Sequence, residues 1–208
     1  MIRWDKLKFR NLGYKDSHQL YLALRDSGSD YLGAFLEWGT RIDKYSEAAV
    51  QKTVVMDITQ PFPHEHFVVE YLGLLIAFGS SGKSSFAEGV QVTYWVRRSF
   101  SGQGIGTWLV SEMLSHLFLV RNRSIVEIHT DRLNTASAKI PISLGFSPIN
   151  HYTQSKNYGV KSSKEMTVWV KLSPRVTVSS NLEKLRVGRM FKDSPSFSAP
   201  KNDSFCQS

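Results

Sequence analysis

Two glycine-containing stretches of the chain carry residue types that can bind phosphate. The first, AFGSSGKS (77–84), fits the loose P-loop pattern of Ala or Gly, four variable residues and Gly-Lys-Ser, in which backbone N–H groups and a lysine hold nucleotide phosphates. A P-loop must open a helix, yet only four residues separate it from an alternating, strand-like segment that begins at Gly89. We therefore predict a flexible, serine-rich hairpin loop over GSSGKSS (79–85) and reject a nucleotide site there.

The second stretch, SFSGQGIGTWLV (99–110), is better placed to bind an anion. Its glycines, Gly102, Gly104 and Gly106, stand between an alternating strand and an amphipathic helical segment. Bare backbone can approach a pyrophosphate there, and the helix N-terminus can face it. The glycine triplet is weak evidence by itself, since glycines also mark ordinary turns. The alternating strand suggests a half-exposed antiparallel or mixed sheet, which disfavours a Rossmann site.

Hydrophobic periodicity predicts the elements that position this loop. Helices are expected from Asp16 or Ser17 as N-cap through 26, over 31–38, from Ser46 onward, over 107–119, and from Asn134 to Leu144. Strands are expected over 6–12, twice within 66–78 around a turn at Gly73, and over 89–96, 124–130 and 165–172.

Length and composition predict one domain with a tail. We assign residues 1–173 of the 208 to the domain and 174–208 to a serine- and proline-rich, basic and flexible tail. Within the tail, 181–191 is either a short docking helix or unstructured. The net charge of +8 favours a polyanionic ligand or partner, whether a phosphate-bearing cofactor, RNA or an anionic membrane, unless it only aids solubility.

Several classes of protein are disfavoured. Cys206 is the sole cysteine, which argues against a disulfide framework, a thiolate metal site and a catalytic thiol, and suits the cytoplasm. The N-terminal residues lack the apolar core of a secretion signal, and the longest apolar run, 71–78, is too short to span a bilayer. His64 and His66 resemble a pair of metal-ligating histidines, but no third ligand is recognisable, so no metal is expected.

Two motifs, YWVRRSFSGQGIGTWLVSEML (94–114) and VEIHTDRLNTASAKIPISLGF (126–146), together resemble the acetyl-CoA core of the GNAT N-acetyltransferase superfamily, in its RimJ/RimL-like branch. The resemblance extends more loosely over about residues 5–172. It implies a mixed α/β (α+β) fold with a mostly antiparallel twisted sheet, a splayed central strand pair and flanking helices. It also implies acetyl-CoA as cofactor and an amine as acceptor.

By this resemblance, the strand ending at Val96 splays from its neighbour, and its amides hold the pantetheine arm and polarise the thioester carbonyl. Arg97 and Arg98 either neutralise the phosphates of the cofactor or are solvated surface arginines. Asn134 and Ser137 either contact the cofactor or cap a helix. Ser137 is near enough to protonate the departing thiolate. The cofactor-binding set implied is Val96, Arg97, Arg98, Ser101, Gly102, Gln103, Gly104, Ile105, Gly106, Thr107, Asn134 and Ser137.

Two positions depart from the family pattern. Ser101 stands where the superfamily often has Gln or Arg, although the branch varies there. Pro141 stands where many relatives have a tyrosine that acts as general acid, so the tyrosine-acid mechanism is out of reach at this position.

The catalytic candidates are His129, Ser137 and Glu88. His129 is the preferred base, five residues before Asn134 and near where relatives place an acid-base carboxylate; the alternative is an ordinary sheet-surface histidine. Glu88, at the entrance of a strand, is the second candidate for the base. Glu37 and Trp38 are expected to line the acceptor cleft.

Direct attack of an amine on a thioester needs no protein nucleophile, only a neutral amine and a polarised carbonyl. An α-amino group has a pKa of about 7.7 to 8.0 and lysine one of about 10.4. A site without a strong general base therefore suits a protein N-terminus, for example that of a ribosomal protein, because part of that amine is already neutral. Alternatives are an aminoglycoside or polyamine acetyltransferase, the latter disfavoured by charge repulsion, and an acyl-CoA-binding or RNA-associated module without activity. We expect a monomer or dimer, with no membrane contact and nucleic acid met only indirectly at the ribosome.

Overall fold

The computed structural model describes residues 2–155 and 159–175. The helices are α1 (Ser17–Leu32), α2 (Glu47–Ile58), α3 (Ile105–Ser115) and α4 (Thr135–Ser143). Short helical turns are η1 (Trp4–Lys6), η2 (Tyr14–Asp16), η3 (Trp38–Lys44), η4 (Arg98–Phe100) and the π-helical η5 (His116–Val120). The strands are β1 (Leu7–Asn11), β2 (Glu65–Tyr71), β3 (Leu74–Lys83), β4 (Gly89–Val96), β5 (Ile125–Asp131), β6 (Ser147–Thr153) and β7 (Glu165–Leu172).

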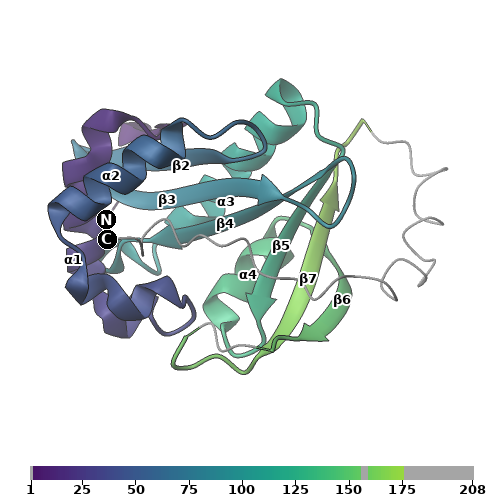
Figure 1. Cartoon of the computed structure of the whole chain (residues 1–208). Helices are drawn as coiled ribbons and strands as arrows, with labels where there is room; N and C mark the ends of the chain where they lie inside the picture. The colour runs from purple at the N-terminus through teal and green to yellow at the C-terminus, as the bar shows by residue number, and fades with distance from the viewer. Residues whose placement is uncertain (1, 156–158, 176–208) are drawn as a thin grey trace.

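The described residues form a seven-stranded sheet in the order β1-β2-β3-β4-β5-β7-β6. Neighbouring strands are antiparallel except β4 and β5, which are parallel. Their pairing covers only Gly89–Gln91 against Ile125–Glu127, after which the two strands diverge (Figure 1). The predicted fold, a mostly antiparallel sheet with a splayed central pair, is confirmed.

Helices cover both faces of the sheet. In Figure 1, α1 and α2 lie in front of β2 and β3, and α3 passes behind the strands. Val90 and Val92 of β4 pack in the core cluster that contains α3, whereas Trp95 belongs to the cluster under α1 and α2. The sequence suggested that the alternation of β4 marks one solvent-facing side. In the structure both sides of the strand are largely covered. Thr93 is the exposed residue of β4, and by alternation with Trp95 it lies on the α1/α2 side of the sheet.

The predicted hairpin loop over 79–85 is wrong for its first five residues. Strand β3 runs on to Lys83, which pairs with Val90. The small residues suit this strand because α3 approaches it closely: a Cβ at Gly79 would lie 2.5 Å from Met113 Sδ. The Ser80 hydroxyl is satisfied by Thr93 at 2.7 Å.

Two further elements differ from the sequence prediction. The helix expected over 31–38 is instead the end of α1, which breaks at Gly28 (φ 71°) and stops at Leu32, before η3 begins at Trp38. Strand β6 was not predicted, because SPINHYT has no clear alternation and its outer side is mostly exposed. The predicted tail, including 181–191, lies outside the described residues from 176 onward.

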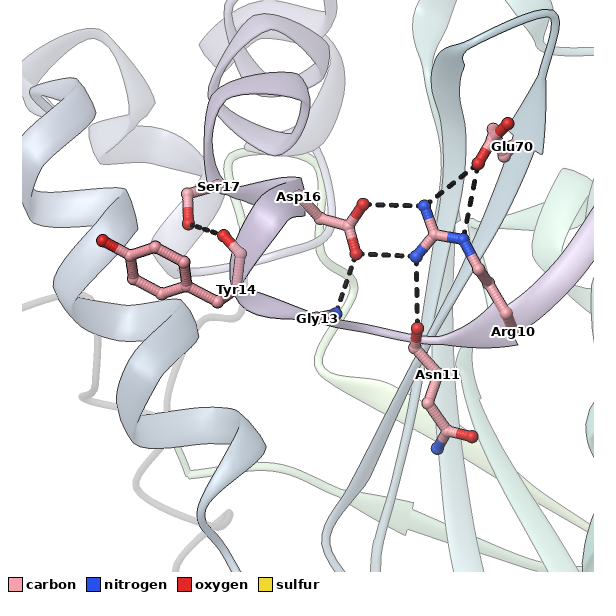
Figure 2. A network of polar contacts seen from close by, with 7 residues as sticks. All are labelled: Arg10, Asn11, Gly13, Tyr14, Asp16, Ser17 and Glu70. Atoms are coloured by element: carbon pink, nitrogen blue, oxygen red, sulfur yellow. Dashed lines mark hydrogen bonds and ion pairs between the residues drawn. The ribbon is translucent and has the colours of Figure 1, made fainter.

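Asp16 is the N-cap residue of α1, as predicted, but its side chain makes no cap hydrogen bond and instead joins a charged network that ties the helix to the sheet. Arg10 of β1 donates to both carboxylate oxygens of Asp16 at 2.7 Å and to Glu70 of β2 at 3.1 Å (Figure 2). Asp16 also accepts from Gly13 N at 2.8 Å. Burial acts to raise the pKa of Asp16, but the hydrogen bonds from Arg10 and Gly13 outweigh it and hold that pKa below its ordinary value.

Asp16→Asn should therefore lower the free energy of unfolding at neutral pH by about 1 to 3 kcal/mol, as expected for a lost hydrogen-bonded charge. The deficit relative to wild type should shrink as pH falls through the folded-state pKa of Asp16, because the protonated carboxyl no longer attracts Arg10. Urea unfolding at several pH values measures both effects. Asp5→Asn, at an exposed ion pair, is the control and should change stability by less than about 0.5 kcal/mol; equal losses in the two variants would contradict this role.

Candidate active site

The gap between β4 and β5 carries backbone donors. Arg97 N donates to Ile76 O of β3 at 2.8 Å, and N–H directions alternate along an extended strand. The N–H groups of Tyr94 and Val96 therefore face away from β3 and into the gap, beyond the last residue of β4 that pairs with β5, Gln91. Such donors can bind and polarise an amide or thioester carbonyl.

The glycine loop before α3 has the conformation and space that a phosphate site requires. Gly102 (φ 73°) and Gly104 (φ 82°) adopt the left-handed conformation, and nothing lies within 4 Å of the position that a Cβ on Gly102 would take. At Gly104 the indole of Trp4 lies 3.2 Å from that position, and at Gly106 the end of Ile140 lies 2.8 Å from it. Larger residues would fill the loop, whereas glycines leave its backbone accessible.

The remaining loop residues frame the start of α3. Gln103 is exposed, Ile105 is buried in the core and Thr107 lies in the first turn of the helix. The positive end of the helix dipole and the first N–H groups of α3 therefore lie directly after Gly104, its N-cap. This arrangement can bind an anion.

The two arginines before the loop contact α1. Arg97 Nε donates to Asp26 at 3.0 Å, and Arg98 Nη1 donates to both oxygens of Asp30 at 2.8 and 2.7 Å. Ser101 Oγ donates to the carbonyl of Arg98 at 2.9 Å. Both guanidinium groups already have carboxylate partners, so this geometry favours a role in fixing the loop to α1; the predicted phosphate contacts stay a prediction.

Asn134 and Ser137 lie at the start of α4. Asn134 is the N-cap, and its side-chain oxygen accepts from Ser137 N at 3.1 Å. The Ser137 hydroxyl lies 3.1 Å from the hydroxyl of Tyr94, which also donates to the Ser137 carbonyl at 3.1 Å. Burial raises the pKa of Tyr94 to about 12, although the Ser137 hydrogen bond opposes this.

His129 of β5 is part of a polar chain. Its Nδ1 lies 3.0 Å from Tyr152 Oη, and its Nε2 lies 3.4 Å from Glu127 Oε1. Glu127 is fully buried and also accepts from Ser85 Oγ at 2.9 Å. Burial acts to raise the pKa of Glu127, but hydrogen bonds from His129 and Ser85 outweigh it and hold the pKa below its usual range. A buried carboxylate that orients an imidazole is an arrangement suited to proton transfer.

His129 and Ser137 approach the gap from opposite faces of the sheet. Val126 and Ile128 pack with α3, so Glu127 and His129 point to the other face by strand alternation. Ser137 lies on α4, whose Ile140 packs with the α3 cluster. A group held through the gap can therefore meet one side chain from each face.

The other candidates lie apart from this pair. Glu88 accepts from Ser124 Oγ at 2.9 Å, at the end of β4 where it still pairs with β5. The structure thus does not bring Glu88 to the splayed end. Glu37 is exposed, and Trp38 packs edge-on against Trp95 with ring centroids 6.5 Å apart, on the face where Thr93 is exposed.

Sequence reasoning missed three side chains of this region. Glu127 stands two residues before His129 and Tyr94 alternates with valines, so period-two spacing could have placed both. Tyr152 gave no signal, because its strand was not predicted. Among the described residues, no three His, Cys, Asp or Glu side chains gather as metal ligands, and no helix is long and apolar enough to cross a bilayer.

Comparison with known proteins identifies the class of this molecule. The acetyltransferase (GNAT) domain family matches residues 7–147. The chain therefore belongs to the GNAT acetyltransferase family, whose members transfer acetyl from acetyl-CoA. No curated protein matches the chain.

Solved structures of several acetyltransferases share the fold. The ribosomal L7/L12 α-N-protein acetyltransferase RimL in complex with coenzyme A is 16% identical, with a TM-score of 0.72 over 80% of this chain and 94% of its own. The microcin C7 self-immunity acetyltransferase MccE, in complex with acetyl-CoA and AMP, is 13% identical (TM-score 0.71; 81% and 93%). A spermidine N-acetyltransferase SpeG chimera from Vibrio cholerae and hSSAT is 14% identical (TM-score 0.65; 81% and 96%). At these identities the likeness shows the fold and not the acceptor.

A substitution at Gly104 tests the glycine loop. Gly104→Glu and Gly104→Gln both place a side chain at positive φ, which costs about 1 to 2 kcal/mol of stability, but only Glu brings a negative charge to the anion site. We expect both variants to bind acetyl-CoA more weakly than wild type, and Glu about tenfold more weakly than Gln, by titration calorimetry. Wild-type affinity in Gly104→Glu would show that phosphates bind elsewhere.

Proposed function

We propose that the protein is a cytoplasmic N-acetyltransferase that transfers acetyl from acetyl-CoA directly to the α-amine at a protein N-terminus, with a ribosomal protein as the first candidate acceptor. The observation that carries this proposal is the Glu127–His129–Tyr152 chain at the splayed end of β4 and β5. It provides a proton acceptor on one face of a gap whose other face has a phosphate-binding loop.

The residues around the gap fit acetyl-CoA. The open backbone at Gly102, with the first N–H groups of α3, suits the pyrophosphate. The N–H groups of Tyr94 and Val96 suit the pantetheine arm and the thioester carbonyl. When bound, acetyl-CoA supplies an activated acetyl group and a thiol leaving group.

His129 acts as the base in this proposal. Glu127 holds Nε2 as an N–H, and the Tyr152 hydroxyl lies on Nδ1. The acceptor's proton therefore passes to the Tyr152 oxygen as the hydroxyl hydrogen of Tyr152 moves to Nδ1, and the buried negative charge of Glu127 stabilises the imidazolium that results. The amine reaches His129 from the α1/α2 side, where Thr93 is exposed and Trp38 and Trp95 form an aromatic wall. On the other face, Ser137 donates to the departing sulfur.

The chemistry favours an α-amine over lysine. With a single histidine as base, an α-amine with a pKa of about 7.7 to 8.0 is already partly neutral, whereas lysine at about 10.4 requires about 4 kcal/mol of additional help. The net charge of +8 favours approach to the anionic ribosome and opposes binding of polycationic polyamines.

Acetyl transfer to a peptide panel tests the proposed function. Peptides with free N-termini should release thiol from acetyl-CoA, and the same peptides with a blocked N-terminus and a free lysine should react at least about tenfold more slowly. Spermidine and an aminoglycoside complete the panel. Faster transfer to either small amine would replace the proposed acceptor, and acetyl-CoA binding without thiol release for any amine would refute the enzyme proposal.

His129→Gln should lower kcat by about 100-fold, within the range of general-base contributions, and leave acetyl-CoA affinity within about twofold. His151→Gln, at an exposed histidine of β6, is the matched control. An unchanged kcat in His129→Gln would remove His129 from this role.

A further inference from the structure

A tyrosine hydroxyl spans the splayed gap on the side opposite His129. Tyr94 lies three residues beyond Gln91, the last residue of β4 that pairs with β5. Its hydroxyl reaches α4, 3.1 Å from both the carbonyl oxygen and the hydroxyl of Ser137. This contact joins β4 to the start of α4, the helix that follows β5.

We propose that Tyr94 is a positioning residue for acetyl transfer: it donates its hydrogen to the Ser137 hydroxyl and thereby turns the Ser137 hydrogen toward the departing sulfur. This inference rests on the function proposed above. It adds a tyrosine on β4 to a site in which the position of the family's tyrosine acid, on α4, is occupied by Pro141.

The count of hydrogens allows two arrangements of this pair. Tyr94 and Ser137 have one hydroxyl hydrogen each, and a hydroxyl oxygen can both donate and accept. When Tyr94 donates to Ser137 Oγ, the Ser137 hydrogen must find a different acceptor, and the gap is the side where sulfur departs. When Tyr94 donates to the Ser137 carbonyl instead, Ser137 can donate back to Tyr94 Oη and is withdrawn from the gap. Arrival of negative charge on sulfur favours the first arrangement.

Burial keeps the phenol in its donor form. With a pKa of about 12, Tyr94 retains its proton at any pH at which the amine reacts. A thiol titrates near about 8.5, so the protons stay on the two oxygens and stabilise the sulfur by hydrogen bonding.

The reaction then balances without a change at either hydroxyl. The amine nitrogen forms a bond to the acetyl carbon, the C–S bond breaks, and its electron pair stays on sulfur. His129 holds the proton lost by the amine and returns it to solvent, and the released thiolate takes up one proton from solvent, so the protons balance. Tyr94 and Ser137 end as they began, which fits a pair that acts by orientation.

The side-chain packing keeps Tyr94 in place with or without its hydroxyl. The ring packs against the core cluster that includes Val92 and Ile105, so Tyr94→Phe removes one oxygen and leaves the apolar contacts. Tyr71→Phe is the matched control, because that ring packs against the same cluster and its edge meets Phe100.

A double-mutant cycle tests the inference, using acetyl-CoA and the best acceptor peptide of the panel. Tyr94→Phe should lower kcat about tenfold with the KM for acetyl-CoA within about twofold, and Tyr71→Phe should match wild type. Ser137→Ala should lower kcat at least as much. The double variant should equal Ser137→Ala, because Tyr94 acts through Ser137.

Three results would overturn the inference. An equal loss from Tyr94→Phe in wild type and in Ser137→Ala would show that Tyr94 does not act through Ser137. A weaker acetyl-CoA affinity by calorimetry with kcat intact would reduce Tyr94 to a structural support of the gap. Full kcat in Ser137→Ala would show that neither hydroxyl takes part in the chemistry, and the proposed acetyl transfer would still stand. Absence of acceptor-dependent thiol release by the wild-type protein would refute the Tyr94 inference and the proposed function together.

Discussion

The structure depends on one constraint, the parting of β4 and β5 after three residues of parallel pairing. Each strand keeps an antiparallel neighbour to its end, β3 for β4 and β7 for β5, so the sheet stays intact while one side of each strand becomes free. Backbone donors of β4 then face a gap, and side chains of both faces meet there. The Tyr94–Ser137 contact closes one face, and Glu127 and His129 line the other. A continuous ladder would have consumed the same backbone groups and left no place for a thioester.

Much of this arrangement could be predicted from sequence, because its signals are local. The alternation of 89–96 and 124–130 marked the two strands, and the glycines at 102, 104 and 106 marked the loop that needs positive φ and open space. Asn134 was predicted to contact the cofactor or cap a helix, and its side chain does accept from Ser137 N as a cap. His129 was placed on a definite face by strand periodicity alone, and the structure adds the two partners that orient it.

The rest depended on contacts between distant segments, which periodicity does not encode. Gly79–Lys83 reads as a loop by composition, and it is a strand because α3 packs closely over Gly79 and because β4 supplies its ladder. Strand β6 has little apolar content and exists because β7 pairs with it. Arg97 and Arg98 looked like phosphate ligands because they precede the glycine loop, but aspartates some 70 residues earlier in the chain take up their charge. Tyr152 became visible as a partner of His129 only with β6 in place.

The two ion pairs from α1 to the glycine loop have a thermodynamic consequence. Asp26 and Asp30 stand on either side of the break at Gly28, and the residues just after them lead into the segment with Trp38. Helix α1 therefore adjoins the glycine loop on one side of the gap and the aromatic residues Trp38 and Trp95 on the other. If loop geometry changes on binding, α1 carries part of that change to the acceptor side, and linkage makes the effect reciprocal. Acceptor and cofactor would then raise or lower each other's affinity by one common factor.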